Sequence, residues 1–426
     1  MISIDPSTAG QPPHSPSRQA DRLHCRSCSG SNLTTFLDLG SQPLANALLE
    51  ERQLSEAEPC FPLELAFCRD CSLVQVTETI PPDVLFGRDY PYYSSFSPAL
   101  LAHSRDHVQR ILTESTLDSR SLVVEVASND GYLLSNFLEA GIPVLGVDPA
   151  AGPVAAACKR GVPTLQAFFG AELARKLAAE GKHADVMIAN NVVAHVDQIN
   201  DFIEGFAILL KDEGLARLEV AYLRDMIEKC EFDTVYHEHV FYWSVAAMER
   251  LLSRHGLHLN DAERLPIHGG SIRLTTSKKP GKSERLTGLL AEEASLGMDD
   301  LSYYRSFAAH VEDLRQTLHA SIQQKRSEGA RLAAYGAAAK GATLLNYMKF
   351  ESGVLEYVVD RNPAKVGKYL PGARLPIRPV ETLTLERPDY VLVLAWNFAT
   401  EIIQQNQEYT RMGGQFILPV AERPSL

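Results

Sequence analysis

The alternation of apolar and polar positions divides most of the chain into short strands and amphipathic helices. Apolar runs rich in β-branched residues predict buried strands at 121–127, 144–148, 185–193 and 214–220. After a charged helical stretch near 299–328, the alternation returns, with strands expected at 331–336, 355–360 and 390–396 and a helix at 342–349. Two such blocks predict two α/β folds of the doubly wound, Rossmann-like kind.

The N-terminal part of the chain does not follow this pattern. Residues 1–22 are rich in proline and serine and lack the apolar core of a signal peptide, so we expect a disordered leader. Residues 23–80 are hydrophilic and rich in turn residues. The length of 426 residues suits two to three domains at roughly 150 residues each. We therefore expect a small module at 23–80, a middle domain at 81–295 and a C-terminal domain at 296–426.

The charge balance is acidic, with 41 basic and 53 acidic residues and a formal net charge of −12. This balance argues against sequence-independent binding of nucleic acid, although a local pocket can still hold a small anion. No apolar run approaches the roughly 18 residues that a membrane span requires. We expect a cytoplasmic protein without a membrane segment, in a compartment where paired cysteines hold metal or perform redox chemistry.

Four cysteines form two C-x-x-C pairs, Cys25 with Cys28 and Cys68 with Cys71, with 39 residues between the pairs. Each pair lets two thiolates converge at a turn, and four thiolates complete the tetrahedral shell of a structural Zn²⁺ ion. The alternatives are two unrelated turns or a thioredoxin-like redox pair. A redox pair needs a βαβ context that these flanks lack, so the sequence favours one architectural zinc ion per chain.

A tight turn, Ser128-Asn-Asp-Gly131, follows the first strand of the middle domain and opens a helix. The second strand ends in Asp148, where doubly wound folds place an acid for ribose hydroxyls. The turn lacks the G-x-G-x-x-G spacing that brings the backbone close to a pyrophosphate, which favours S-adenosylmethionine over a dinucleotide. The expected cofactor contacts are Glu125, Ser128, Asn129, Asp130, Gly131, Asp148, Phe168 and Asn190.

Ionisable side chains crowd the segment Tyr236-His-Glu-His239, with Tyr242 just beyond it. Imidazole titrates near neutral pH, so this segment suits proton abstraction, with a carboxylate to orient the ring. In an extended strand, Tyr236 and Glu238 would face one side and His237 and His239 the other. The alternatives are a metal site or a polar surface loop. The spacing differs from H-E-x-x-H, which disfavours catalytic zinc.

The C-terminal block carries a second loop of small residues between a strand and a helix, Gly336-Ala-Ala-Ala-Lys-Gly341. Small residues allow the backbone to approach a phosphate, and Lys340 adds a positive charge. Taken alone, this pattern would suggest a site for NAD.

Three motifs resemble those of the sugar C-methyltransferases of deoxysugar biosynthesis, which also serve antibiotic pathways. The motifs are Glu125-Val-Ala-Ser-Asn-Asp-Gly131, Tyr236-His-Glu-His239 and His268-Gly-Gly-Ser271. The resemblance covers roughly residues 23 to 420. It implies an N-terminal zinc module, a central class I methyltransferase domain that binds S-adenosylmethionine, and a C-terminal Rossmann-like domain for a nucleotide sugar.

The resemblance also implies a reaction and a set of residue roles. The substrate would be a nucleotide-linked 4-keto-deoxysugar, carried on dTDP and methylated at carbon three, next to the ketone. His239 would be the base, with Glu238 as its partner or competitor for that role. Tyr236, His195 and Tyr90 would line the sugar or steady an enolate. The expected substrate contacts are Lys340, Tyr90, Tyr242 and Asn397, in a cleft between the middle and C-terminal domains.

Two other functions remain open at this point. One is a methyltransferase that acts on an oxygen or nitrogen atom of a sugar. The other is a scaffold protein that binds the cofactor without turnover, although a scaffold has no need for the residues at 236–239. A chain with this many domains can work as a monomer.

Overall fold

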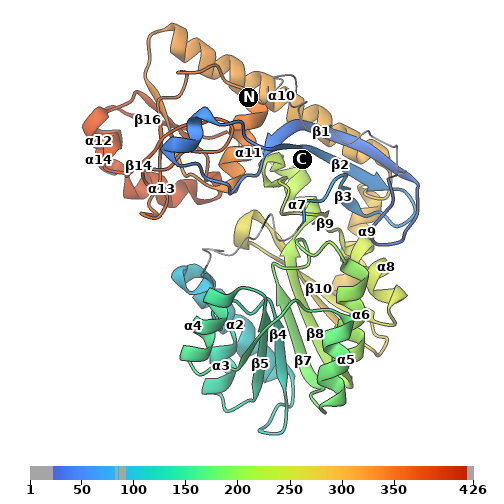
Figure 1. Cartoon of the computed structure of the whole chain (residues 1–426). Helices are drawn as coiled ribbons and strands as arrows, with labels where there is room; N and C mark the ends of the chain where they lie inside the picture. The colour runs from blue at the N-terminus through green and yellow to red at the C-terminus, as the bar shows by residue number, and fades with distance from the viewer. Residues whose placement is uncertain (1–22, 82–84, 86–92, 420–426) are drawn as a thin grey trace, which may run out of the picture.

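The computed structural model of the chain describes residues 23–81, 85 and 93–419 (Figure 1). Tyr90, which the resemblance assigns to the substrate, lies outside the described residues. Within the described ranges the strands form three sheets. No helix in this part of the chain is long and apolar enough to cross a membrane.

The central sheet has seven strands in the order β10-β11-β8-β7-β4-β5-β6. They are β4 (Val123–Val126), β5 (Val144–Asp148), β6 (Thr164–Gln166), β7 (Ala184–Asn190), β8 (Leu210–Ala221), β10 (His258–Leu265) and β11 (Ser271–Ser277). β11 is antiparallel to both of its neighbours, whereas the strands from β8 to β6 are parallel. The strand order reverses at β4, and open α/β sheets bind ligands beyond the strand ends at this point.

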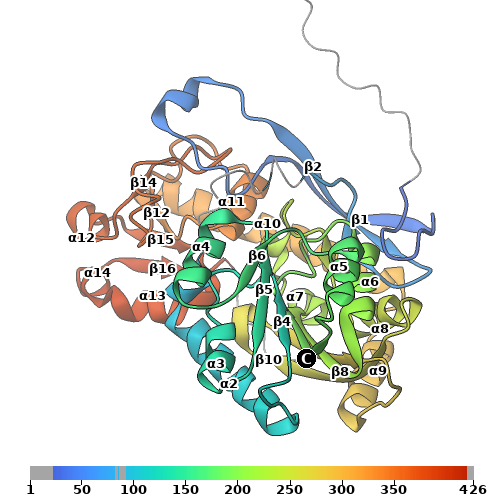
Figure 2. The ribbon, with the colours of Figure 1, turned by 60° about the horizontal axis from the view of Figure 1, so that its bottom comes forward.

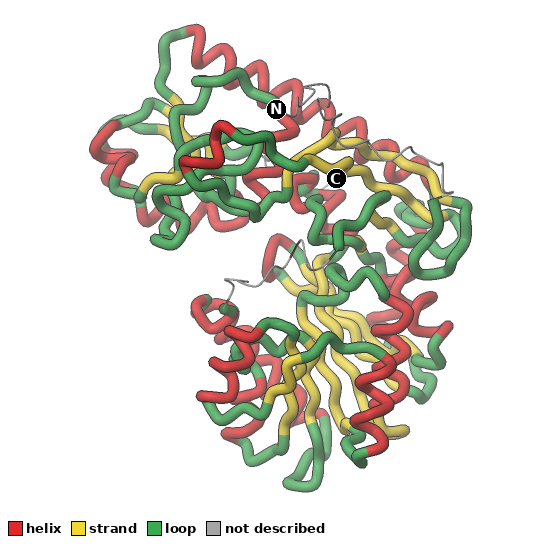
Figure 3. Tube along the Cα trace, in the orientation of Figure 1, coloured by secondary structure: helices red, strands yellow, loops and turns green. Residues whose placement is uncertain are grey.

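Helices cover both faces of this sheet (Figure 3), because the strands are apolar on both sides. In β4, Val123 packs in the cluster that includes α2, α3 and α4, while Val124 packs in the cluster that includes α5 and α6. The bounds of these helices are α2 Pro98–Glu114, α3 Leu134–Glu139, α4 Ala151–Lys159, α5 Ala171–Ala179 and α6 Ile199–Leu209. The connecting helices are η2 Ser94–Phe96, α7 Leu223–Glu228, η3 Phe232–Thr234, α8 Val245–Arg254, η4 Ile267–Gly269 and α9 Glu284–Ser295.

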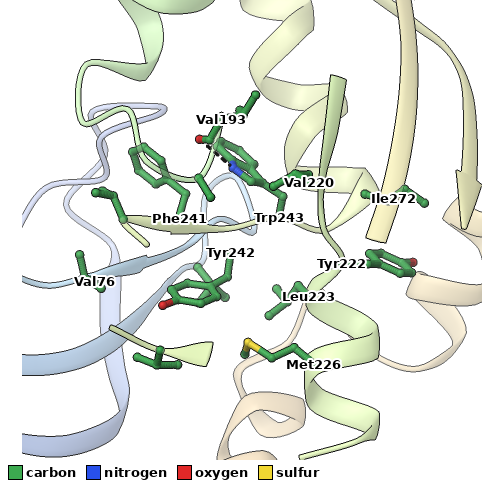
Figure 4. Packing of buried hydrophobic residues seen from close by; sticks show 14 of the residues in the cluster. Val76, Val193, Val220, Tyr222, Leu223, Met226, Phe241, Tyr242, Trp243 and Ile272 are labelled. Atoms are coloured by element: carbon green, nitrogen blue, oxygen red, sulfur yellow. Dashed lines mark hydrogen bonds between the residues drawn. The ribbon is translucent and has the colours of Figure 1, made fainter. Parts of the chain in front are cut away.

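The N-terminal sheet takes its fourth strand from the middle of the chain. β1 (Leu33–Pro43), β2 (Cys60–Cys68) and β3 (Val74–Val76) are antiparallel, with η1 (Glu51–Ser55) in the loop between β1 and β2. β9 (Phe241–Tyr242) pairs antiparallel with β3. Figure 4 shows the packing around β9, where the indole of Trp243 donates a hydrogen bond to the Val193 carbonyl at 3.3 Å.

The third sheet is parallel, in the order β14-β13-β12-β15-β16. Its strands are β12 (Leu332–Tyr335), β13 (Val358–Val359), β14 (Ile377–Arg378), β15 (Tyr390–Val393) and β16 (Gln415–Ile417). Its helices are α10 (Leu301–Ser327), α11 (Ala339–Met348), α12 (Thr382–Glu386), η5 (Trp396–Phe398), α13 (Ala399–Gln405) and α14 (Gln407–Arg411). The strand expected at 355–360 is thus only two residues long, and the helix expected at 342–349 begins three residues earlier.

The N-terminal sheet also contacts the C-terminal part of the chain. β1 packs against α10 and α11, and Figures 1 and 2 show the β1–β2 hairpin beside these helices. The Tyr304 ring of α10 contacts the rings of Phe36 and Phe67 at centroid distances of 5.2 and 4.6 Å. Leu49 and Tyr369 exchange two backbone hydrogen bonds of 2.8 and 2.9 Å. The N-terminal sheet is therefore attached to the middle of the chain through β9 and to the C-terminal part through α10, α11 and Tyr369.

Candidate active site

The four paired cysteines meet at one point, and each pair sits in a tight turn. Ser29 N–H donates to the Cys25 carbonyl and Ser72 N–H to the Cys68 carbonyl, both at 2.8 Å. The sulfur atoms lie 3.5 Å apart in Cys25 and Cys71 and 3.6 Å apart in Cys28 and Cys68, and the sulfurs of all four lie within 4.8 Å of one another. A tetrahedron with Zn–S distances of about 2.3 Å has sulfur atoms about 3.8 Å apart, so the cluster fits a zinc ion.

The turn after β4 has positive φ values at three residues, of which only one is glycine. Ala127 and Asn129 have φ values of +57° and +49°, and Gly131 has +74°. Positive φ is the conformation that glycine adopts most readily, and Ala127 and Asn129 adopt it here without being glycine. A Cβ atom at Gly131 would lie 2.9 Å from Val162 and 3.2 Å from Ala157. Packing against Val162 and Ala157, together with its positive φ, therefore requires glycine at position 131.

Asp148 ends β5 and organises this turn. Its two carboxylate oxygens accept backbone hydrogen bonds from Asn129 and Ala150, both at 2.9 Å. Burial raises the pKa of the Asp148 carboxyl, and these two hydrogen bonds oppose the shift. Each oxygen keeps a second lone pair, so the carboxylate can still accept a hydrogen bond from a ribose hydroxyl.

Buried polar atoms without partners lie at the carboxyl ends of β4 and β7. Among the described residues, Glu125 Oε2, Ser128 Oγ and Asn190 Oδ1 are buried and make no hydrogen bond. Such atoms are costly unless a ligand or water satisfies them. Phe168, just beyond β6, exposes 70% of its surface and offers an aromatic face. These groups fit S-adenosylmethionine, which has amino, carboxylate, hydroxyl and adenine groups to satisfy them. Asp130 instead pairs with Arg160 at 3.3 Å.

We expect Asp148→Ala to weaken the binding of S-adenosylmethionine by roughly 1.5–3 kcal/mol, because a charge-assisted hydrogen bond to the ribose is lost. Titration calorimetry measures this directly. The control is Asp212→Ala, which removes a carboxylate that is exposed on β8 and should leave binding unchanged. Equal affinities in the two variants would place the ribose elsewhere.

His239 lies in a turn, and the hydrogen bonds of its ring indicate the neutral form. His239 N–H donates to the Tyr236 carbonyl at 2.9 Å, which brings the two side chains together. Nδ1 of His239 lies 2.9 Å from the Thr234 carbonyl, which can only accept, so Nδ1 carries the proton. Nε2 is then bare and accepts a hydrogen bond from the Tyr236 hydroxyl at 2.7 Å. The ring of His195 lies 4.8 Å from the ring of His239, centroid to centroid.

This turn gives the segment a different facing from that of an extended strand. Because the backbone is not extended, Tyr236 and His239 lie together, while His237 and Glu238 point to the N-terminal sheet. Glu238 Oε1 accepts a hydrogen bond from the Asn46 side chain at 2.7 Å, and His237 Nε2 lies 3.3 Å from the Phe61 carbonyl. Glu238 is therefore not the hydrogen-bond partner of His239. Its backbone carbonyl accepts from His195 Nδ1 at 2.8 Å.

The surroundings favour the neutral form of both imidazoles. Loss of hydration lowers the pKa of His239 well below its usual value, and the nearby His195 ring and the charge of Lys340 also disfavour a proton on His239. Loss of hydration also lowers the pKa of His195 to about 4. A lone pair on His239 Nε2 is therefore available at neutral pH without prior deprotonation.

Trp396 links the C-terminal part of the chain to the loop that precedes Tyr236. Lys340, on the first turn of α11, places Nζ 4.6 Å from the centre of the Trp396 ring. The indole N–H of Trp396 donates to Asp233 Oδ2 at 2.6 Å. Asn397 is partly buried in η5 beside Trp396, and the Tyr242 ring lies 6.3 Å from the His239 ring. Tyr236, His195 and Tyr242 thus lie around the His239 ring, and Lys340 is linked to this region through Trp396 and Asp233.

The sequence analysis did not identify four residues that lie in this region of the structure. Glu231 and Asp233 lie on the loop that leads to Tyr236, and their nearness to that motif was an available signal. Trp396 sits next to Asn397, the residue that was chosen instead. Asn46 contacts Glu238 across 192 positions of sequence, and nothing local indicates that contact.

The order of the seven strands, with β11 reversed, is that of the class I S-adenosylmethionine-dependent methyltransferases. Three family models match the chain: "Putative zinc binding domain" at residues 25–86, "Methyltransferase domain" at 97–261 and "C-methyltransferase C-terminal domain" at 266–421. C-methyltransferase NovU from Streptomyces niveus is 35% identical over 401 residues, which are 93% of this chain and 95% of the relative. The chain therefore belongs to the C-methyltransferase family and is an S-adenosylmethionine-dependent C-methyltransferase.

More distant similarities cover less than half of the chain. A ubiquinone biosynthesis O-methyltransferase from Bartonella tribocorum is 28% identical over 156 residues, which are 35% of this chain and 61% of the relative. The solved structure of magnesium protoporphyrin IX methyltransferase from Synechocystis PCC 6803 with bound S-adenosylmethionine shares 16% identity. It covers 42% of this chain and 79% of that one, with a TM-score of 0.32. These distant similarities carry no information on the substrate. Membership of the C-methyltransferase family argues against both alternatives that the sequence left open. These were methylation of an oxygen or nitrogen atom and a scaffold protein without turnover.

Proposed function

We propose that the enzyme methylates a nucleotide-linked 4-keto-deoxysugar, carried on dTDP, at carbon three beside the ketone. The observation that supports this proposal is the pairing of the Tyr236 hydroxyl with the bare Nε2 atom of His239. An acid and a base in contact suit a ketone whose oxygen gains charge while the neighbouring carbon loses a proton.

The bound cofactor supplies an electrophilic methyl group, and the protein must make a sugar carbon nucleophilic. In the proposed mechanism His239 Nε2 removes the proton from the carbon beside the ketone, and the electron pair moves into an enolate. The Tyr236 hydroxyl turns to the ketone oxygen and stabilises its charge. The enolate carbon would then accept the methyl group that a bound cofactor supplies, with S-adenosylhomocysteine as the leaving group. His195 donates through Nδ1 to a backbone carbonyl, so we assign it to lining the sugar.

The phosphates of the substrate have a candidate contact in Lys340. This side chain is on the first turn of α11, where backbone N–H groups lack partners within the helix. Its ammonium group also lies over the Trp396 ring, which fixes the direction of the side chain. We therefore assign Lys340 to the diphosphate, with Asn397 and Tyr242 as further contacts of the nucleotide sugar.

The test is incubation of the enzyme with S-adenosylmethionine and a panel of dTDP-4-keto-deoxysugars. We expect one member to gain the mass of a single methyl group, and NMR to place that group on carbon three. If no member is methylated, or if the methyl group is found on oxygen, the proposed substrate is wrong.

The pH dependence should report the lowered pKa of His239. Because Nε2 must be unprotonated to act, kcat/KM should fall only when the pH drops through the pKa of His239, well below 6.5. Burial raises the pKa of Glu231 to about 7 and of Asp233 to about 6, so these carboxylates also titrate in the measured range. An acid limb that persists in both Glu231→Gln and Asp233→Asn belongs to His239. A persistent midpoint at or above 6.5 would contradict the assignment.

A further inference from the structure

The loop that leads to the catalytic segment holds three buried acceptor atoms. Glu231, Asp233 and Thr234 expose only 4%, 0% and 6% of their surfaces. Among the described residues, Glu231 Oε1, Asp233 Oδ1 and Thr234 Oγ1 are buried and make no hydrogen bond. Two carboxylate oxygens and one hydroxyl oxygen, buried without hydrogen bonds within four positions, are costly, which points to a ligand that completes them.

The two carboxylates are held in place by other parts of the chain. Asp233 Oδ2 accepts the indole hydrogen bond of Trp396 from the C-terminal sheet, which leaves Oδ1 as the oxygen without a partner. The Glu231 carboxylate lies against the backbone of Gly269, where a Cβ atom would be 2.8 Å from Oε2. Gly269 has a φ of +95°, so both its space and its conformation require glycine. The Gly-Gly motif thus makes room for Glu231.

These acceptors belong to the surroundings of the base. The backbone carbonyl of Thr234 holds Nδ1 of His239 at 2.9 Å. The charge of Lys340 acts on Glu231, Asp233 and His239 alike, so the lysine lies within electrostatic range of all three. η3, which contains Asp233 and Thr234, packs directly against α11, which contains Lys340.

We propose that Glu231 and Asp233 are specificity-determining residues that accept hydrogen bonds from hydroxyl groups on the sugar ring of the substrate. This inference rests on the proposed function. A sugar ring carries several donors, as three acceptors require, whereas a diphosphate carries none and is repelled by carboxylates. Glu231, Asp233 and Lys340 therefore orient a nucleotide sugar. Its ring lies at the two carboxylates beside His239, and its phosphates lie at Lys340.

The experiment crosses protein variants with substrate analogues. Each of the wild type, Asp233→Asn and Glu231→Gln is assayed with pairs of dTDP-4-keto sugars that differ by one ring hydroxyl, at C2 or C3. We expect the wild type to prefer the hydroxylated sugar by about 10- to 100-fold in kcat/KM, since a buried acceptor is left unpaired by the deoxy sugar. If Asp233 or Glu231 accepts a hydrogen bond from one of these hydroxyl groups, the variant of that residue should reduce the preference for the sugar that carries it to below about threefold. Glu228→Gln, which changes a carboxylate paired with Arg224, is the control and should keep the full preference.

The outcomes separate the two proposals. If the wild type methylates no keto sugar, the proposed function fails. If it methylates a sugar and both variants keep the wild-type preference, the proposed function stands and the role of Glu231 and Asp233 is overturned. Cofactor binding by calorimetry shows which variants are folded. If Asp233→Asn does not fold, Glu231→Gln carries the same test.

Discussion

Replacing His239 with asparagine should lower kcat by about two to four orders of magnitude, the usual loss when a general base is removed. Asparagine can still donate to the Thr234 carbonyl, as Nδ1 does now, but it cannot hold a proton at neutral pH. Binding of the cofactor should survive in calorimetry, because His239 is not among the expected cofactor contacts.

A solvent-exchange assay isolates the proton transfer from the methyl transfer. In deuterated water, with S-adenosylhomocysteine in place of the methyl donor, the wild type should exchange the hydrogen beside the ketone and His239→Asn should not. Glu238→Gln is the matched control, because Glu238 faces Asn46 and should keep its exchange activity. Exchange lost in Glu238→Gln but kept in His239→Asn would transfer the role of base to Glu238. Normal exchange in both would make the segment structural.

Replacing Cys25 with serine should unfold the N-terminal module and abolish activity as well. A structural zinc site contributes on the order of 10 kcal/mol to folding, more than a small module can lose. The module also supplies Asn46 to Glu238 and pairs β3 with β9, directly after the catalytic segment. Elemental analysis should find close to one zinc ion per wild-type chain, and limited proteolysis should cut the variant within residues 25–76.

Cys60→Ser is the control for this experiment, since Cys60 lies in the same module but is exposed and outside the four-cysteine cluster. It should bind zinc and methylate like the wild type. A wild-type protein without zinc, or a stable and active Cys25→Ser variant, would contradict the metal site.

The helices and strands that the sequence predicted correctly are those determined by local sequence. The strand expected at 144–148 is β5, because a run of apolar residues that ends in an acid determines both its burial and its end. The turn at Ala127 was harder, since its left-handed backbone is strained and carries no glycine to mark it. The contact of Glu238 with Asn46 could not be predicted, because it depends on β9 joining a sheet that begins near residue 33. The sequence also did not indicate which side chains of residues 236–239 share a side, since a turn closes the segment before β9 begins.

The shared sheet has a consequence for synthesis on the ribosome. β3 is complete at Val76, but its partner β9 begins at Phe241, roughly 160 residues later. At about 5–20 residues per second, β3 waits about 8 to 30 seconds with one edge open, and such edges invite pairing with other chains. The N-terminal module is therefore finished only after most of the central sheet has been made. A chain cut anywhere between these two strands leaves both pieces with an unpaired strand edge.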